Sequence, residues 1–186
     1  MAKKSSTDLI QCIEEFKIEL KQSSWFSKVR KQIKSLATNC DFIRCLAIGE
    51  PKDQQVQYQI AFLLLLIDEY NCPSSVWDPI LKKQDIQLFQ ELEIEVTKKD
   101  PTDSNCLWFV PHAPYFLEPE IIQKIGTNVY IGNNMTMYRA GSVRDPKLVE
   151  AAKQEWTILP LKEQKNNNWY QGFINTAVQQ LKTSNQ

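Results

Sequence analysis

The sequence predicts one α/β domain of the three-layer, Rossmann-like kind, in which a mostly parallel, doubly wound sheet carries helices on both faces. Strand-like and helix-like segments alternate along its 186 residues, which favours parallel pairing through right-handed crossovers. The strand-like runs are short and almost continuously apolar, a pattern typical of sheets that are covered on both faces. A chain of this length can bury a continuous core without disulfides or metal.

Residues 1–38 are predicted to be a helical segment, in two pieces that meet near Ser23–Ser24. The second piece shows apolar side chains at three- and four-residue spacing on one face. These side chains are Trp25, Phe26, Val29, Ile33 and Leu36. We expect this face to pack on the sheet.

Residues 41–144 form the predicted α/β core. Its strands are expected, in chain order, at 42–48, 75–77, 93–97, 106–110 and 128–131. A strongly apolar helix is expected at 54–70, and shorter helices around 86–92 and 121–125. Pro73 ends the long helix, because proline disfavours α geometry in the residue before it. Gly132 is expected to close the last of these strands.

Residues 145–186 are predicted to extend the same single domain at its C-terminus. We expect a helix near 147–154, a strand at 157–161, a cap at Asn166–Asn168 and a closing helix that reaches about Leu181.

Composition excludes several classes of protein. Basic and acidic residues number 22 each, so no overall field draws the chain to nucleic acid or acidic membranes. The longest apolar run, Ile60–Ile67, is far shorter than the roughly 20 residues that span a bilayer. The N-terminal residues do not resemble a secretory signal, and five scattered cysteines suit free thiols. We therefore expect a cytoplasmic or nuclear protein. With a single histidine, we expect no metal site.

Open α/β sheets bind ligands outside the carboxyl ends of their strands, so the residues that follow the strands are the candidate site. They are Gly49, Glu50, Trp77, Asp78, Pro111, His112, Gly132 and Asn133. Gly49 stands where a phosphate-binding turn would lie, but the G-x-G-x-x-G pattern is absent, and an ordinary strand-to-helix turn also explains it. Glu50 adds negative charge and Pro51 lacks an N–H, so this turn should resist a pyrophosphate more than a neutral or cationic ligand.

Asp78 ends the second strand, where a carboxylate in nucleotide-binding folds accepts hydrogen bonds from ribose hydroxyls. Starting a turn before Pro79 is an equally good interpretation. Trp77 beside it either packs in the core or offers its ring for stacking on a ligand.

His112 is the one side chain of the candidate site that titrates near neutral pH, so it is a candidate general acid or base. Capping its own turn is the alternative role. Gly132 and Asn133 either offer amide groups to a ligand or simply make a turn. Arg139 and Arg144 could likewise hold an acidic partner or form a solvated face.

Five short motifs follow one another at compatible spacings between Cys45 and Tyr138. They are Cys45–Gly49, the helix with Gln57–Gln59 and Leu63–Leu66, Val76–Pro79, Trp108–His112 and Ile131–Asn133. In this order they make the chain resemble the Sensitivity to Red light Reduced family. The resemblance places family sites on Gly49, Asp78, Pro79, Pro111, His112, Gly132 and Asn133.

The resemblance implies a small regulatory protein of the eukaryotic cytoplasm and nucleus. The family is linked in plants to red-light signalling and the circadian clock, in animals to the regulation of haem biosynthesis and in fungi to microtubules. Protein partners are therefore expected, and no settled enzymatic activity comes with the family. Two departures matter: Ala47–Glu50 lacks the family's second glycine and serine, and Ala113 replaces a cysteine, which argues against a His–Cys metal or redox pair.

Two functions follow as expectations. The first is a regulatory protein that senses a small adenosine-type ligand at the strand ends. The alternative is an adenosylmethionine-dependent, methyltransferase-like enzyme, whose sulfonium cofactor would suit Glu50, with Asp78 on the ribose and His112 as base. Haem is a third ligand to consider, because Cys72–Pro73 resembles the Cys–Pro pairs of haem sensors, although a helix stopped by proline explains this pair without haem.

Overall fold

The computed structural model describes residues 6–101, 105–111, 113–139, 145–162 and 165–182. Within them, seven strands form one sheet in the order β3-β2-β1-β4-β5-β7-β6. The strands are β1 (Phe42–Leu46), β2 (Ser74–Trp77), β3 (Glu95–Val96), β4 (Cys106–Val110), β5 (Val129–Asn133), β6 (Trp156–Pro160) and β7 (Thr176–Leu181). The first five are parallel, and β7 is antiparallel to both β5 and β6. The predicted mostly parallel sheet is therefore confirmed.

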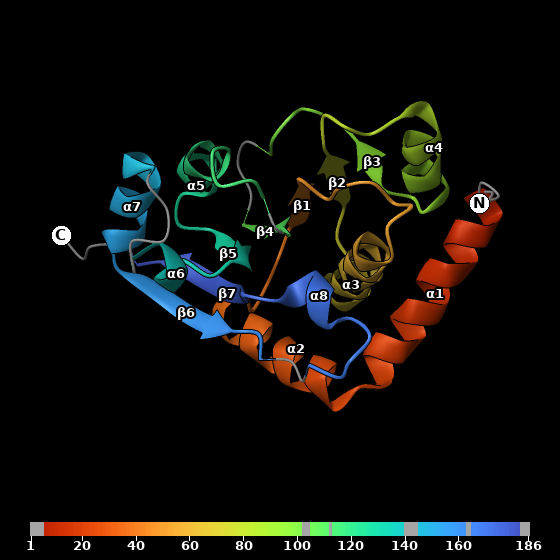
Figure 1. Ribbon diagram of the computed structural model, residues 1–186, viewed down its shortest axis with the longest axis horizontal. Helices are drawn as coiled ribbons and strands as arrows, with labels where there is room; N and C mark the ends of the chain where they lie inside the picture. The colour runs from red at the N-terminus through yellow and green to blue at the C-terminus, as the bar shows by residue number, and fades with distance from the viewer. Residues whose placement is uncertain (1–5, 102–104, 112, 140–144, 163–164, 183–186) are drawn as a thin grey trace.

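Helices cover both faces of the sheet (Figure 1). One apolar core is shared by α1 (Ser6–Gln22), α2 (Ser24–Leu36), α3 (Gln54–Tyr70), α4 (Lys83–Glu91) and the short α8 (Tyr170–Phe173). The opposite core is closed by α5 (Glu118–Ile125), α6 (Thr136–Arg139) and α7 (Pro146–Lys153). The three-layer arrangement is thus the one that the alternating sequence predicts.

The predicted helix boundaries agree with the structure along the N-terminal half. α1 and α2 meet at Ser23, whose hydroxyl accepts a hydrogen bond from the Phe26 N–H at 3.0 Å and so caps α2. α3 is buried from Val56 to Leu66 and ends in left-handed Asn71, just before Pro73. No helix in the described part of the chain combines the length and apolarity needed to cross a membrane.

Two predictions near the C-terminus are wrong. The closing helix is limited to α8, because Asn175 takes a positive φ of 60° and the chain continues as β7. Its backbone groups pair with β5 on one side and β6 on the other, which satisfies hydrogen bonds that those strands would otherwise lack. Gly132 does not close β5 either, since the strand continues to Asn133.

The strand order reverses between β1 and β4, which lie side by side at the middle of the sheet. The chain moves from β1 toward β2 on one side and from β4 toward β5 on the other. Such a switch point opens a crevice beyond the carboxyl ends of the two strands. The predicted candidate residues Gly49 and Pro111 follow these two strands.

Candidate functional site at the switch point

The turn after β1 is shaped by two left-handed residues. Ala47 has a φ of 53° and Gly49 a φ of 89°. A Cβ on Gly49 would also lie 3.0 Å from Cγ2 of Val56, so glycine is required here for backbone and packing reasons. The turn delivers the chain into α3 directly beside the switch point.

Asp78 holds this turn in place from the neighbouring strand end. Its Oδ2 accepts the Gly49 N–H at 2.9 Å, and its Oδ1 accepts the Ile80 N–H at 3.0 Å. The residue is 7% exposed. Asp78 therefore starts the turn after β2 and also ties that turn to the one after β1. The Gly49 amide, which a bound phosphate would need, is already engaged; ribose binding by Asp78 stays a prediction.

A cavity of about 370 Å³ opens between the turn after β1, the start of α3, Pro111 after β4 and the α8 segment, and we call it the switch-point cavity. Its lining is aliphatic and amide in character. The lining residues are Ala47, Ile48, Gly49, Gln55, Val56, Gln59, Pro111, Gln171 and Ile174. Gln59 is fixed by a 2.9 Å hydrogen bond from its Nε2 to the Gly172 carbonyl. The volume lies in the range of small-molecule sites, and none of these lining side chains is charged.

Glu50 lies at the rim of this region and is neutralised by two lysines. Its carboxylate pairs with Lys52, and with Lys82 at 3.0 Å. These hydrogen bonds lower the pKa of Glu50. The negative charge that the sequence places in this turn is therefore balanced locally.

Trp77 is half-buried, and Lys98 Nζ lies 4.9 Å from its ring centroid.

Gly132 and Asn133 belong to the end of β5. A Cβ on Gly132 would lie 2.3 Å from the Tyr130 ring, so this glycine lets the ring lie along the strand. Asn133 donates its Nδ2 to the Ala113 carbonyl at 3.0 Å and accepts Gln179 Nε2 on its own carbonyl at 2.7 Å. These contacts tie the strand end to the loop after β4 and to β7.

A buried cluster of one carboxyl group and two tyrosine hydroxyls lies beside Asn133, and the sequence did not predict it. Glu118, fully buried at the start of α5, accepts hydrogen bonds from the hydroxyls of Tyr130, at 2.8 Å, and Tyr138. Burial raises the pKa of Glu118 to about 7, against the opposite effect of hydrogen bonds from Tyr138, Tyr130 and Asn133. A glutamate in the first turn of a helix is ordinary, so the sequence carries no signal for these partners.

Large apolar side chains are exposed along the same edge of the sheet. Ile80 follows β2, Tyr115 and Phe116 follow β4, and Met137 lies in α6 after β5, and each is more than a third exposed. The Tyr115 and Phe116 rings pack edge to face, with centroids 5.8 Å apart. We call these four residues the apolar rim.

His112 and Arg144 lie outside the described residues. Arg139 donates to the carbonyls of Ala152, at 2.6 Å, and Gln154, at 2.9 Å, and thereby binds the C-terminal end of α7.

Cys72, the cysteine considered for haem, is half-buried, and its Sγ lies 3.8 Å from that of Cys40. Burial raises the pKa of Cys72 to about 12, which disfavours the thiolate that a metal requires. Among the residues that the structure describes, no group of three or more acidic, cysteine or histidine side chains could hold a metal ion.

Comparisons with known proteins agree with the sequence motifs. A family model for the SRR1 domain, the domain of the Sensitivity to Red light Reduced family, matches residues 17–180. A search of curated proteins finds no match. Among solved structures, the chain is similar to SAH-bound Podospora anserina methyltransferase PaMTH1, with a TM-score of 0.46 and 9% sequence identity over 94% of this chain and 88% of that chain. An identity this low says nothing about the ligand of this chain.

Proposed function

Because the chain belongs to the SRR1-domain family, we propose that it is a regulatory protein that binds a small ligand in the switch-point cavity. The observation that carries the proposal is the place and lining of this cavity, at the carboxyl ends of β1 and β4. The regulatory links of the family to the clock, to light signalling and to haem biosynthesis support a regulatory role.

An adenosine-type compound is the ligand class that the lining favours. Glutamine amides can pair with the donor and acceptor edge of adenine, and the exposed Gln55 and Gln171 line the cavity beside Gln59, whose Nε2 is already bound to the Gly172 carbonyl. Ile48 and Val56 offer apolar surface to the flat ring. The engaged Gly49 amide disfavours a pyrophosphate, so a nucleoside or a cationic nucleoside derivative fits better than a dinucleotide.

The test is calorimetric titration of the purified protein with adenosine, adenosylmethionine, its demethylated product and haem. Thermal unfolding gives a second readout, because a ligand at about 100 times its Kd raises the free energy of unfolding by about 2.7 kcal/mol. Gln55→Lys should abolish binding, because it puts a charge into the cavity wall. Gln54→Lys is the matched control, since Gln54 is exposed on the same turn of α3 but does not line the cavity. Equal behaviour of the two variants, or no binding by any compound, would contradict the proposal.

The fate of bound adenosylmethionine distinguishes a regulatory site from a catalytic one. The protein is incubated with adenosylmethionine and a cell extract as the source of acceptors, and the products are measured by mass spectrometry. A regulatory site leaves adenosylmethionine intact. Formation of the demethylated product above a Gln55→Lys blank would contradict a purely regulatory role and favour the methyltransferase-like alternative.

Protein partners are proposed to bind at the apolar rim, because exposed apolar groups gathered at one edge are typical of interaction sites. Tyr115→Ser with Phe116→Ser should then reduce partner capture in pull-downs without loss of ligand binding. The exposed Ile18→Ser on α1 provides the control.

A further inference from the structure

Two thiols meet at the amino ends of two neighbouring strands, on the side of the sheet away from the switch-point cavity. Cys40 precedes β1 and Cys72 precedes β2, whereas the cavity lies beyond the carboxyl end of β1. The Cys72 thiol donates to Sγ of Cys40 across 3.8 Å. The fold therefore brings into contact two thiols that lie 32 positions apart in the sequence.

Hydrogen bonds fix the backbone on both sides of this contact. β1 and β2 are parallel neighbours with Ile43 opposite Ser74, and the Ile43 N–H donates to the Pro73 carbonyl at 3.0 Å. The Tyr70 hydroxyl, at the end of α3, donates to the Ala37 carbonyl at 2.5 Å. Neighbouring strands lie about 4.8 Å apart, and a disulfide joins Cα atoms that are roughly 4.4–6.8 Å apart. The two chain segments are therefore spaced for a disulfide.

The two thiols differ in their access to solvent. Cys72 is half-buried, whereas Cys40 is 9% exposed. A dissolved reagent therefore reaches Cys72 first. Cys45 lies further along β1, and Cys106 belongs to the core on the opposite face of the sheet. Cys40 is thus the thiol placed to react with a modified Cys72.

We propose that Cys40 and Cys72 are a reversible dithiol–disulfide pair that closes within the native fold when it meets a small organic disulfide. The Cys72 thiolate attacks one sulfur of that disulfide, forms a mixed disulfide with it and displaces a first small thiolate. The Cys40 sulfur, after losing its proton, attacks Sγ of Cys72 and displaces the second. The protein loses two protons and two electrons, and one small disulfide is reduced to two thiols. Transient disulfides of this kind sense redox changes in reducing compartments.

Burial sets the rate of this exchange. It raises the pKa of Cys72 to about 12 and also raises the pKa of Cys40, and the nearby Asp41 adds to both effects. Tyr70 and Cys106 are the other titratable groups near the pair. Only the thiolate attacks a disulfide, so the rate of oxidation should rise about tenfold for each pH unit between pH 7 and pH 9.

Oxidation of the folded protein by glutathione disulfide, followed by mass spectrometry of tryptic peptides, tests the pair. Free thiols are blocked with N-ethylmaleimide before digestion, and trypsin then places each cysteine on a peptide of its own. We expect one crosslink, between residues 35–44 and residues 53–82, which dithiothreitol reverses.

Two variants make this test specific. Cys72→Ser should abolish the crosslink. Cys12→Ser is the matched control, because Cys12 is also half-buried but lies on α1, and its crosslink between Cys40 and Cys72 should form at an unchanged rate. Circular dichroism verifies that both variants fold.

The disulfide should also stabilise the fold, because it restricts an unfolded chain by joining residues 32 positions apart. We expect the oxidised protein to unfold roughly 5 to 15 °C above the reduced protein. Cys72→Ser should show no such difference between oxidising and reducing buffer.

Four results would overturn the proposal. They are no crosslink at pH 9 with glutathione disulfide in excess, a stable mixed disulfide on Cys72 in place of the crosslink, a crosslink that forms only in urea-unfolded protein, and an oxidised form that unfolds no higher than the reduced one. All four are measured on the unchanged sequence, so they decide the proposal even if Cys72→Ser does not fold.

Discussion

Two buried carboxyl groups occupy the same edge of the sheet and are held in different ways. Asp78, after β2, accepts two backbone N–H groups, from Gly49 and Ile80. Glu118, after β4, accepts two side-chain hydroxyls, from Tyr130 and Tyr138. The first carboxylate fixes the path of the chain. The second depends on side chains brought from other elements, and its pKa is raised to about 7, so the Glu118 side of the edge is expected to respond to pH.

The largest effect is expected from Asp78→Ala, which leaves two backbone N–H groups without their acceptor. Hydrogen bonds to a charged group contribute roughly 1.5–3 kcal/mol each, so the variant should lose about 3 to 6 kcal/mol of unfolding free energy. Chemical denaturation measures this loss. Asp53→Ala removes the same charge at the start of α3, where the side chain makes no capping hydrogen bond, and should cost no more than about 1 kcal/mol. Similar losses of unfolding free energy in both variants would contradict the role of Asp78 in holding the two turns.

Glu118→Gln should remove a pH dependence of stability. The unfolded carboxyl has a pKa of about 4.3 and the folded one about 7, so between these values the folded state keeps a proton that the unfolded state releases. The unfolding free energy of the natural protein therefore falls by about 4 kcal/mol as pH rises through this window, and stays level above it.

Urea denaturation at a series of pH values from 4 to 8 measures this slope of unfolding free energy against pH. The exposed Glu120→Gln on the same helix should keep it, and a slope that persists in Glu118→Gln would show that another group causes it.

Gly132→Ala should destabilise the protein by about 2 kcal/mol, because the added methyl overlaps the Tyr130 ring and forces it to move. Moving Tyr130 weakens its hydrogen bond to Glu118, a bond that lowers the pKa of that carboxyl. The pKa of Glu118 should therefore rise, and the unfolding free energy should keep falling up to a higher pH. Gly126→Ala meets no atom within 4 Å and only bears a positive φ of 57°, so about 1 kcal/mol and an unchanged pH profile are expected. Thermal unfolding across pH compares the two.

Tyr138→Phe is expected to have the smallest effect, about 1 kcal/mol, since it removes one hydrogen bond and keeps the ring. The Tyr138 hydroxyl lowers the pKa of Glu118, so its loss should raise that pKa further. Direct titration of the Glu118 carboxyl by NMR measures the change. A pKa that falls in this variant would contradict the assigned hydrogen bond.

The sequence predicted those elements whose signals are local. The long helix at 54–70 and the strand at 106–110 have the predicted bounds, because apolar runs end at Asn71 and Pro111. β7 was missed because its polar glutamines resemble a solvated helix, whereas Gln179 is buried and bridges Asn133 O and Met135 N. Only pairing with β5 and β6 makes this segment a strand.

The candidate site was likewise predictable only where its residues carry a local signal. The residues after β1, β2 and β4 could be named from the rule that strand ends bind ligands, and Gly49 and Pro111 do line the switch-point cavity. The partners of Glu118 lie 12 and 20 residues further along the chain, and no spacing rule connects them. Gln171 and Ile174 enter the cavity from a segment that was expected to continue as helix.

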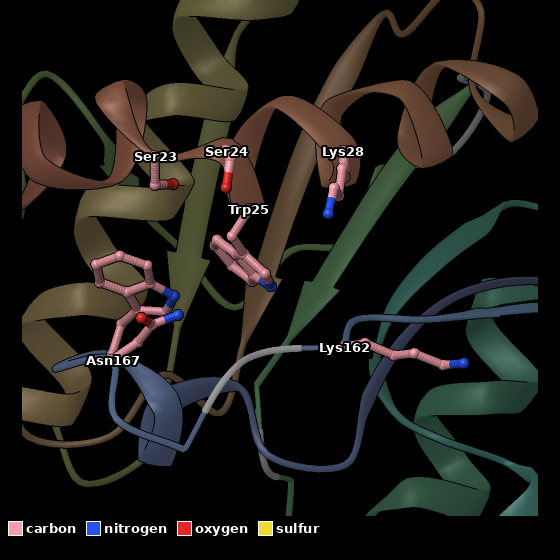
Figure 2. Close-up of a pocket in the computed structure, with 7 residues that line it drawn as sticks. Ser23, Ser24, Trp25, Lys28, Lys162 and Asn167 are labelled. Carbon is pink, nitrogen blue, oxygen red and sulfur yellow. The ribbon is translucent and has the colours of Figure 1, made fainter.

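The segment around α8 belongs to two cavities at once. Asn167 and Trp169 line a cavity of about 320 Å³ at the N-terminus of α2 (Figure 2), and Gln171 and Ile174 line the switch-point cavity. A ligand in one cavity that shifted this segment would alter affinity in the other, and thermodynamic linkage would make that coupling reciprocal, with one factor for both directions.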